Sequence, residues 1–196
     1  MIRTVIGGLV GGIIIFVIGF IFWATPLGEI PYSKAGEAQN AALQASLAQN
    51  LTASGTGAYI IPAHNSAAGA VLYARGPIAT VHFNTRGYSP DDMSMILPGF
   101  IVAVASGLLM AFGLASVGGG GRSFAGLAQL VVCFSLGFTV WEFLGSPIFN
   151  HYGWGYWIYA FVAESLSLIL AGLAIARWFM PHYRPAEAAA PPATAP

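Results

Sequence analysis

The sequence predicts an all-α membrane protein with four transmembrane helices and a small extracytoplasmic α+β cap between the first and second helix. Hydrophobic residues make up 57% of the 196 residues and charged residues only 7%, whereas an average soluble domain carries about 25% charged residues. Four apolar runs are each long enough to cross about 30 Å of hydrocarbon, which takes roughly 20 helical residues. The net charge is zero, so no basic surface for nucleic acid is expected.

The four predicted spans are residues 4–24, 95–117, 123–145 and 155–179. Every backbone polar group in lipid must be bonded within its own segment, so these runs are expected to be helices. The predicted organisation is a first transmembrane helix over residues 1–24, a cap over 25–94, and three further helices over 95–180. The Ala/Pro-rich residues 181–196 are typical of a disordered cytoplasmic tail, and the four glycines at 118–121 of a flexible turn.

The basic residues predict the orientation. Arg3 precedes the first span, Arg122 lies between the second and third, and Arg177 and Arg184 end the fourth. With four spans these positions lie on one side, which the positive-inside rule assigns to the cytoplasm. Both termini are therefore expected in the cytoplasm, and the cap outside.

Within the cap, an Ala/Gln-rich stretch at 34–51 has leucine at every fourth position towards its end, which indicates an amphipathic helix. Three short β-prone runs follow at 58–61, 70–73 and 79–83, bounded by Gly, Pro and Asn. The cap is thus expected to combine a helix with two or three strands. Its apolar core is thin, so we expect it to lean on the membrane helices or on a partner.

Small residues recur on one face of each span. The first span has Gly7 with Gly11 and Gly8 with Gly12, and the second has Gly107 among alanines. Such spacing lets helix backbones approach closely in lipid. The rows fit packing within a four-helix bundle, and they also fit docking to another subunit or self-association.

Two acids lie within predicted spans. Glu164 is near the middle of the fourth span, where a charge costs several kcal/mol, so it is expected to face protein or water or to carry a proton. It is expected either to bond a neighbouring Ser, Thr or Tyr, to take part in proton or cation coupling, or to contact a partner. Glu142 lies nearer the outer interface, where water and headgroups are within reach.

The residues 146–157 form an aromatic outer turn that contains His151. This turn is expected to be either an interface belt or, with Glu142, the lining of a polar pocket. None of the four histidines lies inside a predicted span, and no two are three or four residues apart. Axial haem histidines and a helical metal site are therefore not expected, and no cofactor is predicted.

The order of features resembles uncharacterised bacterial four-span inner-membrane proteins. The resemblance covers most of residues 1–180 and rests on a Gly-rich first span ending at Trp23, an Ala/Leu helix, the run GAYIIP at 57–62, the run GPIA at 76–79, a second span containing Pro98, an aromatic turn and an acidic last span. It implies a location in the inner membrane and no activity.

The first hypothesis for the function is a non-catalytic accessory or assembly subunit of a larger membrane complex, with lipid and a partner membrane protein as its contacts. The second is a small homo-oligomeric transporter that couples transport to a proton or cation through Glu164. The third, an enzyme acting on a lipid-linked substrate through Glu142 and His151, lacks an evident catalytic set.

Overall fold

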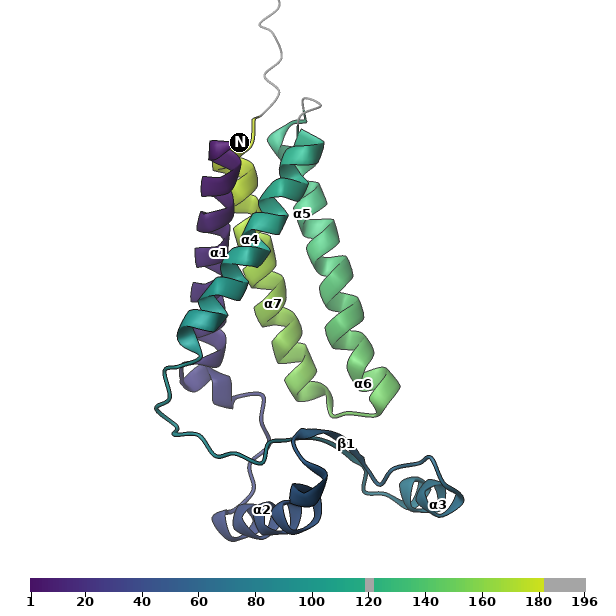
Figure 1. Ribbon diagram of the computed structural model, residues 1–196. Helices are drawn as coiled ribbons and strands as arrows, with labels where there is room; N and C mark the ends of the chain where they lie inside the picture. The colour runs from purple at the N-terminus through teal and green to yellow at the C-terminus, as the bar shows by residue number, and fades with distance from the viewer. Residues whose placement is uncertain (119–121, 182–196) are drawn as a thin grey trace, which may run out of the picture. The chain divides into compact units, whose positions relative to one another are not determined.

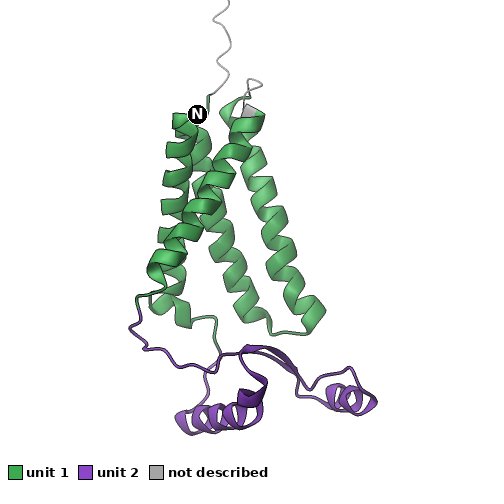
Figure 2. Cartoon of the chain, viewed as in Figure 1, with its two compact units in different colours: residues 1–32, 93–196 green, residues 33–92 purple. Residues whose placement is uncertain are grey.

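The structure is a computed structural model that describes residues 1–118 and 122–181, and it forms two compact units (Figure 2). Unit 1 contains residues 1–32 and the chain from residue 93 onwards, and unit 2 is Ser33–Asp92. The predicted glycine turn, apart from Gly118, and the predicted tail, apart from Pro181, lie outside the described residues.

The four predicted spans are confirmed as helices (Figure 1). They are α1 (Ile2–Trp23), α4 (Ile96–Gly118), α5 (Phe124–Thr139) and α7 (Trp154–Ala174). Helix α5 continues through a π-helical turn (Val140–Leu144) into α6 (Gly145–Asn150), and α7 ends in a π-helical turn (Ile175–Phe179). All four are long and apolar enough to cross a membrane, so the chain is a multi-pass membrane protein.

Helix α1 packs antiparallel against α4 at its glycines. A Cβ atom added to Gly8 would lie 2.7 Å from the Cα of Leu108, and one added to Gly12 would lie 2.5 Å from the Cα of Val104. A Cβ on Gly107 would meet the backbone of α1 itself. Only hydrogen therefore fits at these crossing points, and the close approach supplies the van der Waals contact that holds helices together in lipid.

The opposite glycine pair of α1 faces the end of α7. A Cβ on Gly7 would lie 2.7 Å from the Phe179 Cβ, and one on Gly11 would lie 2.6 Å from the Ile175 Cδ1. Helix α7 in turn packs antiparallel on α5, where Gly172 lies against Val131. The helices therefore follow the order α4, α1, α7, α5, with α1 and α7 in the middle.

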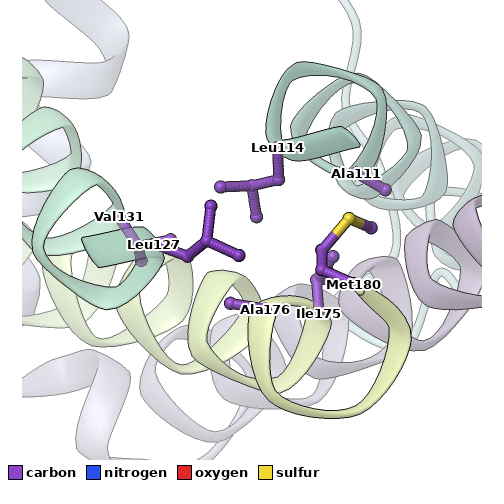
Figure 3. Packing of buried hydrophobic residues seen from close by; sticks show 7 residues of the cluster. All are labelled: Ala111, Leu114, Leu127, Val131, Ile175, Ala176 and Met180. Carbon is purple, nitrogen blue, oxygen red and sulfur yellow. The ribbon is translucent and has the colours of Figure 1, made fainter. Parts of the chain in front are cut away.

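The buried apolar cluster lies where α4 ends, α5 begins and α7 ends (Figure 3). Its members are Ala111, Leu114, Leu127, Val131, Ile175, Ala176 and Met180. Leu127 and Ile175 are the largest fully buried apolar side chains among the described residues. This cluster joins three spans at one end of unit 1.

Unit 2 contains α2 (Glu37–Leu51), β1 (Gly57–Ile61), α3 (Ala67–Arg75) and β2 (Ala79–Phe83). The two strands pair antiparallel, with Tyr59 opposite Val81. The first and third predicted strands are confirmed, but the prediction of a strand at 70–73 is wrong, because these residues belong to α3. The Ser66 hydroxyl accepts the N–H of Gly69 at 3.0 Å and so caps a helix, and the Ala-rich residues that follow favour helix over strand.

The predicted outer turn at 146–157 is also shorter than expected. Residues up to Asn150 are helical in α6 and α7 begins at Trp154, so only His151–Gly153 form the turn. Pro147 has no N–H for the carbonyl of Phe143, and the wider π-helical turn before it leaves room for its ring. The helix therefore continues past a proline that reads as a stop in the sequence.

Candidate functional site

Glu164 lies on α7 towards α1 and is half-buried. The indole Nε1–H of Trp23, the last residue of α1, donates a hydrogen bond to its Oε1 at 3.3 Å. On either side along the same face, Ala160 and Ser167 are buried, which agrees with the inward orientation expected from the sequence. The partner is an indole rather than the Ser, Thr or Tyr hydroxyl expected from the sequence.

Aromatic rings surround this hydrogen bond. The Trp23 ring lies 5.3 Å from that of Tyr159 and 5.9 Å from that of Tyr156, both on α7, and Tyr32 contacts Tyr156 at 5.5 Å. Edge and tilted ring pairs of this kind add stability beyond their buried area. The rings therefore fix the indole that reaches Glu164.

The Tyr159 hydroxyl caps the end of α1. Its oxygen lies 2.7 Å from the carbonyl oxygen of Phe22 and 2.9 Å from that of Leu27, and its hydrogen is directed to these acceptors. The Thr25 hydroxyl donates to the carbonyl of Ile21 at 2.6 Å. The last turn of a helix leaves carbonyl groups without helical partners, so the two hydroxyls satisfy acceptors that would otherwise be costly in lipid.

The roles of Trp23 and Tyr159 were not found from the sequence. In the sequence, Trp23 marks only the end of the first span, and Tyr159 is one of several aromatic residues near the start of the fourth. The available signal was the polar atom each carries, since a buried indole N–H or phenol O–H normally finds a partner.

Glu142 lies in the π-helical turn between α5 and α6 and is exposed, that is, not covered by the chain. Its backbone carbonyl accepts the Ser146 hydroxyl at 2.7 Å. Among the described residues, no hydrogen bond or ion pair involves its side chain. Single π-helical turns occur often at functional sites, and an uncompensated carboxyl inside a span marks a candidate site by itself.

His151 is exposed and adopts a left-handed conformation (φ 57°, ψ 35°) that ends α6. Within the described part of the chain, no hydrogen bond or ion pair links His151, Glu142 and Glu164 to one another. No group of three His, Cys, Asp or Glu among residues 1–118 and 122–181 is placed to hold a metal ion.

A buried hydroxyl pair joins α5 to α7. The Thr139 Oγ1 lies 2.8 Å from the Ser165 Oγ, and it also lies 2.9 Å from the carbonyl oxygen of Ser135. Thr139 is fully buried and Ser165 nearly so. Paired hydroxyls of this kind hold helices together in lipid, which indicates a structural role.

An apolar groove of about 290 Å³ lies between α4 and α5. Its walls are mainly aliphatic and aromatic, with one hydroxyl: Met110, Gly113, Leu114, Val117, Leu130, Val131, Phe134 and Ser135. No pattern in the sequence indicates this groove, because it arises where two spans that are neighbours in the sequence diverge in space.

The candidate site therefore consists of two carboxyls. That of Glu164 is hydrogen-bonded between α1 and α7, and that of Glu142 is exposed on a face of the third span that the rest of the chain does not cover. In comparisons with family models, curated proteins and solved structures, the chain matches none of them.

Proposed function

We propose that this chain is a non-catalytic accessory or assembly subunit of a larger membrane complex in a bacterial inner membrane, with both termini in the cytoplasm. The observation that carries the proposal is the exposure of unit 2. From Ser33 to Asp92 the only buried residue is Gly69. Leu43 in α2 and Leu72 in α3 are exposed by more than half.

A segment of this size is marginally stable even with a good core, and an isolated two-stranded sheet is weaker still. Unit 2 therefore needs a further apolar surface to bury its leucines and tyrosines. A partner protein outside the membrane would supply such a surface.

Unit 1 supports the same proposal in a different way. The glycine rows of α1 are occupied by α4 and α7, so the spans hold themselves together and leave unit 2 and the outer side of α5 as the surfaces for partners. The two intramembrane acids and His151 form no linked set among the described residues, which favours binding over catalysis.

Hydrogen exchange tests the proposal. The chain is purified alone in a stringent detergent and, separately, from native membranes in a mild one. We expect the amides of α2 and α3 to exchange almost unprotected in the isolated chain and about tenfold or more slowly in the native preparation. The amides of α1 serve as the control, because they are expected to be protected in both.

Native mass spectrometry of the second preparation identifies the species. A mass that includes a different membrane protein is expected. A monomer or homo-oligomer alone, with α2 and α3 equally unprotected in both preparations, contradicts the proposal.

A further inference from the structure

The outer side of the third span carries a row of large side chains that the chain does not cover. We name it the Glu142 face and define it by Phe134, Phe138, Trp141, Glu142 and Phe149. Phe134 is 75% exposed and Trp141 is 70% exposed. The Trp141 and Phe149 rings are 5.9 Å apart, so the row continues across the π-helical turn on the same side of the helix.

Other residues of the same span face the protein. Leu127, Val131 and Thr139 are buried, and the Thr139 Oγ1 lies 2.8 Å from the Ser165 Oγ of α7. Helix α5 therefore cannot rotate about its axis without breaking this contact. The hydroxyl pair holds α5 at the rotation in which the Glu142 side chain is exposed.

The depth of Glu142 follows from the length of the span. Phe124–Asn150 has 27 residues and is about 40 Å long, so about 5 Å at each end extends beyond a hydrocarbon layer of about 30 Å. Glu142 is eight residues before Asn150, or about 12 Å along the helix. It thus lies about 7 Å inside the hydrocarbon boundary, where a carboxyl needs a donor.

The rings beside Glu142 indicate which donor. Phe138 and Trp141, four residues and one residue before Glu142, are both exposed, so a cation bound to the carboxylate gains twice, through the ion pair and through contact with a ring. A neutral hydrogen-bond donor is attracted by the carboxylate but not by the rings. The chemistry of the Glu142 face therefore fits a Lys or Arg side chain presented from a neighbouring membrane helix.

Among the described residues, a second copy of this chain offers no such group within a span. Arg3 contacts the carbonyl of Trp178, and Arg177 lies 5.9 Å from the Phe124 ring. Both therefore lie at the end of the spans that is far from Glu142. Arg122 is at that end too, two residues before Phe124. The remaining cations of the described chain, Lys34, Arg75 and Arg86, belong to unit 2, which contains no span. A second copy related by a two-fold axis at this face would place carboxyl against carboxyl.

We propose that the Glu142 face is the membrane contact of this subunit, and that it binds a transmembrane helix of a different protein that carries a Lys or Arg opposite Glu142. This inference rests on the proposed function and specifies the partner chemistry within the membrane. The apolar groove between α4 and α5, which shares Phe134, extends the contact area towards α4.

Photocrosslinking in native membranes tests the inference. Benzoylphenylalanine replaces Phe138 in one chain and, as a control, the exposed Leu109 of α4 in another. From position 138 we expect an adduct with a membrane span of another protein, and peptide sequencing is expected to find Lys or Arg in that span. Glu142→Leu is expected to reduce the adduct yield about tenfold or more, and the yield from position 109 is expected to stay unchanged.

Two further variants complete the design. Replacing the partner's cation by Leu is expected to give the same loss as Glu142→Leu, and exchanging the two charges between the proteins is expected to restore the adduct. Glu142→Leu alone is expected to unfold in micelles at the same or a higher temperature than the wild type, because it removes an uncompensated carboxyl from an apolar surface. A loss of the adduct caused by misfolding would instead lower that temperature.

Adducts from position 138 with lipid alone, with a second copy of the chain, or with a span that lacks a cation would each overturn the inference. So would a yield that Glu142→Leu leaves unchanged. If native mass spectrometry finds a partner but position 138 does not crosslink to it, the subunit role stands and the Glu142 contact fails. If neither experiment finds a partner, the proposed function itself fails.

Discussion

Glu164 shows how a single carboxyl is accommodated inside a membrane span of this chain. Its Oε1 accepts the Trp23 indole N–H at 3.3 Å, and the rings of Tyr156 and Tyr159 hold the indole. Hydrogen bonds between membrane helices contribute about 0.6 kcal/mol on average. The pair is therefore a modest contact that sets the position of the end of α1 against α7.

The first prediction concerns this pair. Glu164→Gln keeps an acceptor for the indole and is expected to change the free energy of unfolding in micelles by less than about 0.5 kcal/mol. In a double-mutant cycle, Glu164→Leu and Trp23→Phe are expected to show a coupling of about 0.6 to 1.7 kcal/mol. Strictly additive effects would show that the hydrogen bond contributes nothing.

The same Gln variant separates the accessory role from a transporter. A coupling carboxyl must gain and lose a proton, which Gln cannot do. We expect vesicles with the wild-type protein to show no proton-coupled flux. Flux in wild-type vesicles that disappears in Glu164→Gln, with the fold intact, would favour the transporter.

The second prediction concerns the hydroxyl pair of α5 and α7. Thr139→Val removes the partner of Ser165 and is expected to lower the free energy of unfolding by about 0.5 to 1.5 kcal/mol. Ser116→Ala is the matched control, because the Ser116 hydroxyl bonds only the carbonyl of Gly113 in its own helix, at 2.7 Å. Unfolding in micelles, followed by circular dichroism, compares the two; equal effects would mean that the interhelical bond is not stabilising.

At the level of the helices, stability depends on how closely α1 approaches its neighbours. Gly8 and Gly12 leave no room for a Cβ against α4, whereas Gly19, in the same helix, has no atom within 4 Å of the position of an added Cβ. The seven-residue continuation from Gly12 to Gly19 is visible in the sequence, but only the first two glycines of this row lie at the crossing with α4.

The third prediction uses this difference. Gly12→Ala forces the backbones of α1 and α4 apart and is expected to cost about 1 to 3 kcal/mol. Gly19→Ala introduces the same methyl group into open space and is expected to be neutral or slightly stabilising, because Ala favours helix more than Gly does. Thermal unfolding of both variants in the same detergent measures the contrast. A similar loss in both would mean that the close approach does not determine the packing of α1.

For the whole molecule, the basic residues that the structure describes in unit 1 gather at one end. Arg3 contacts the Trp178 carbonyl at the end of the fourth span, and Arg177 lies 5.9 Å from the Phe124 ring at the start of α5. Arg122 precedes the Ser123 cap of α5. This arrangement is the one that the positive-inside rule places in the cytoplasm.

The fourth prediction tests this orientation with single cysteines. The native Cys133 is first replaced by Ala, because it is exposed. Ala45→Cys in α2 is expected to react with an impermeant maleimide on intact cells, and Ser123→Cys only after the membrane is opened. Labelling of the Ser123 site from outside would reverse the orientation.

The sequence by itself determined the number of spans, their positions within a few residues, and two of the short strands. These features follow from local physics: a backbone in lipid must satisfy its own polar groups, so a long apolar run is a helix, and alternating β-prone residues between turn signals form strands. The predicted strand at 70–73 failed because the capping hydroxyl of Ser66 outweighed the β-prone side chains of Val71 and Tyr73.

Only the tertiary structure decided which neighbours each span has and which way Glu142 faces. The small residues on one face of a span indicate which side packs but not against which helix; the pairing and the rotation are set by the fit of Gly12 against Val104 and of Thr139 against Ser165. The same fit turns Glu164 towards Trp23 and leaves Glu142 on the outer side of α5. Two acids that look alike in the sequence thus have different surroundings, because contacts between helices, and not the composition of each helix, determine which side is covered.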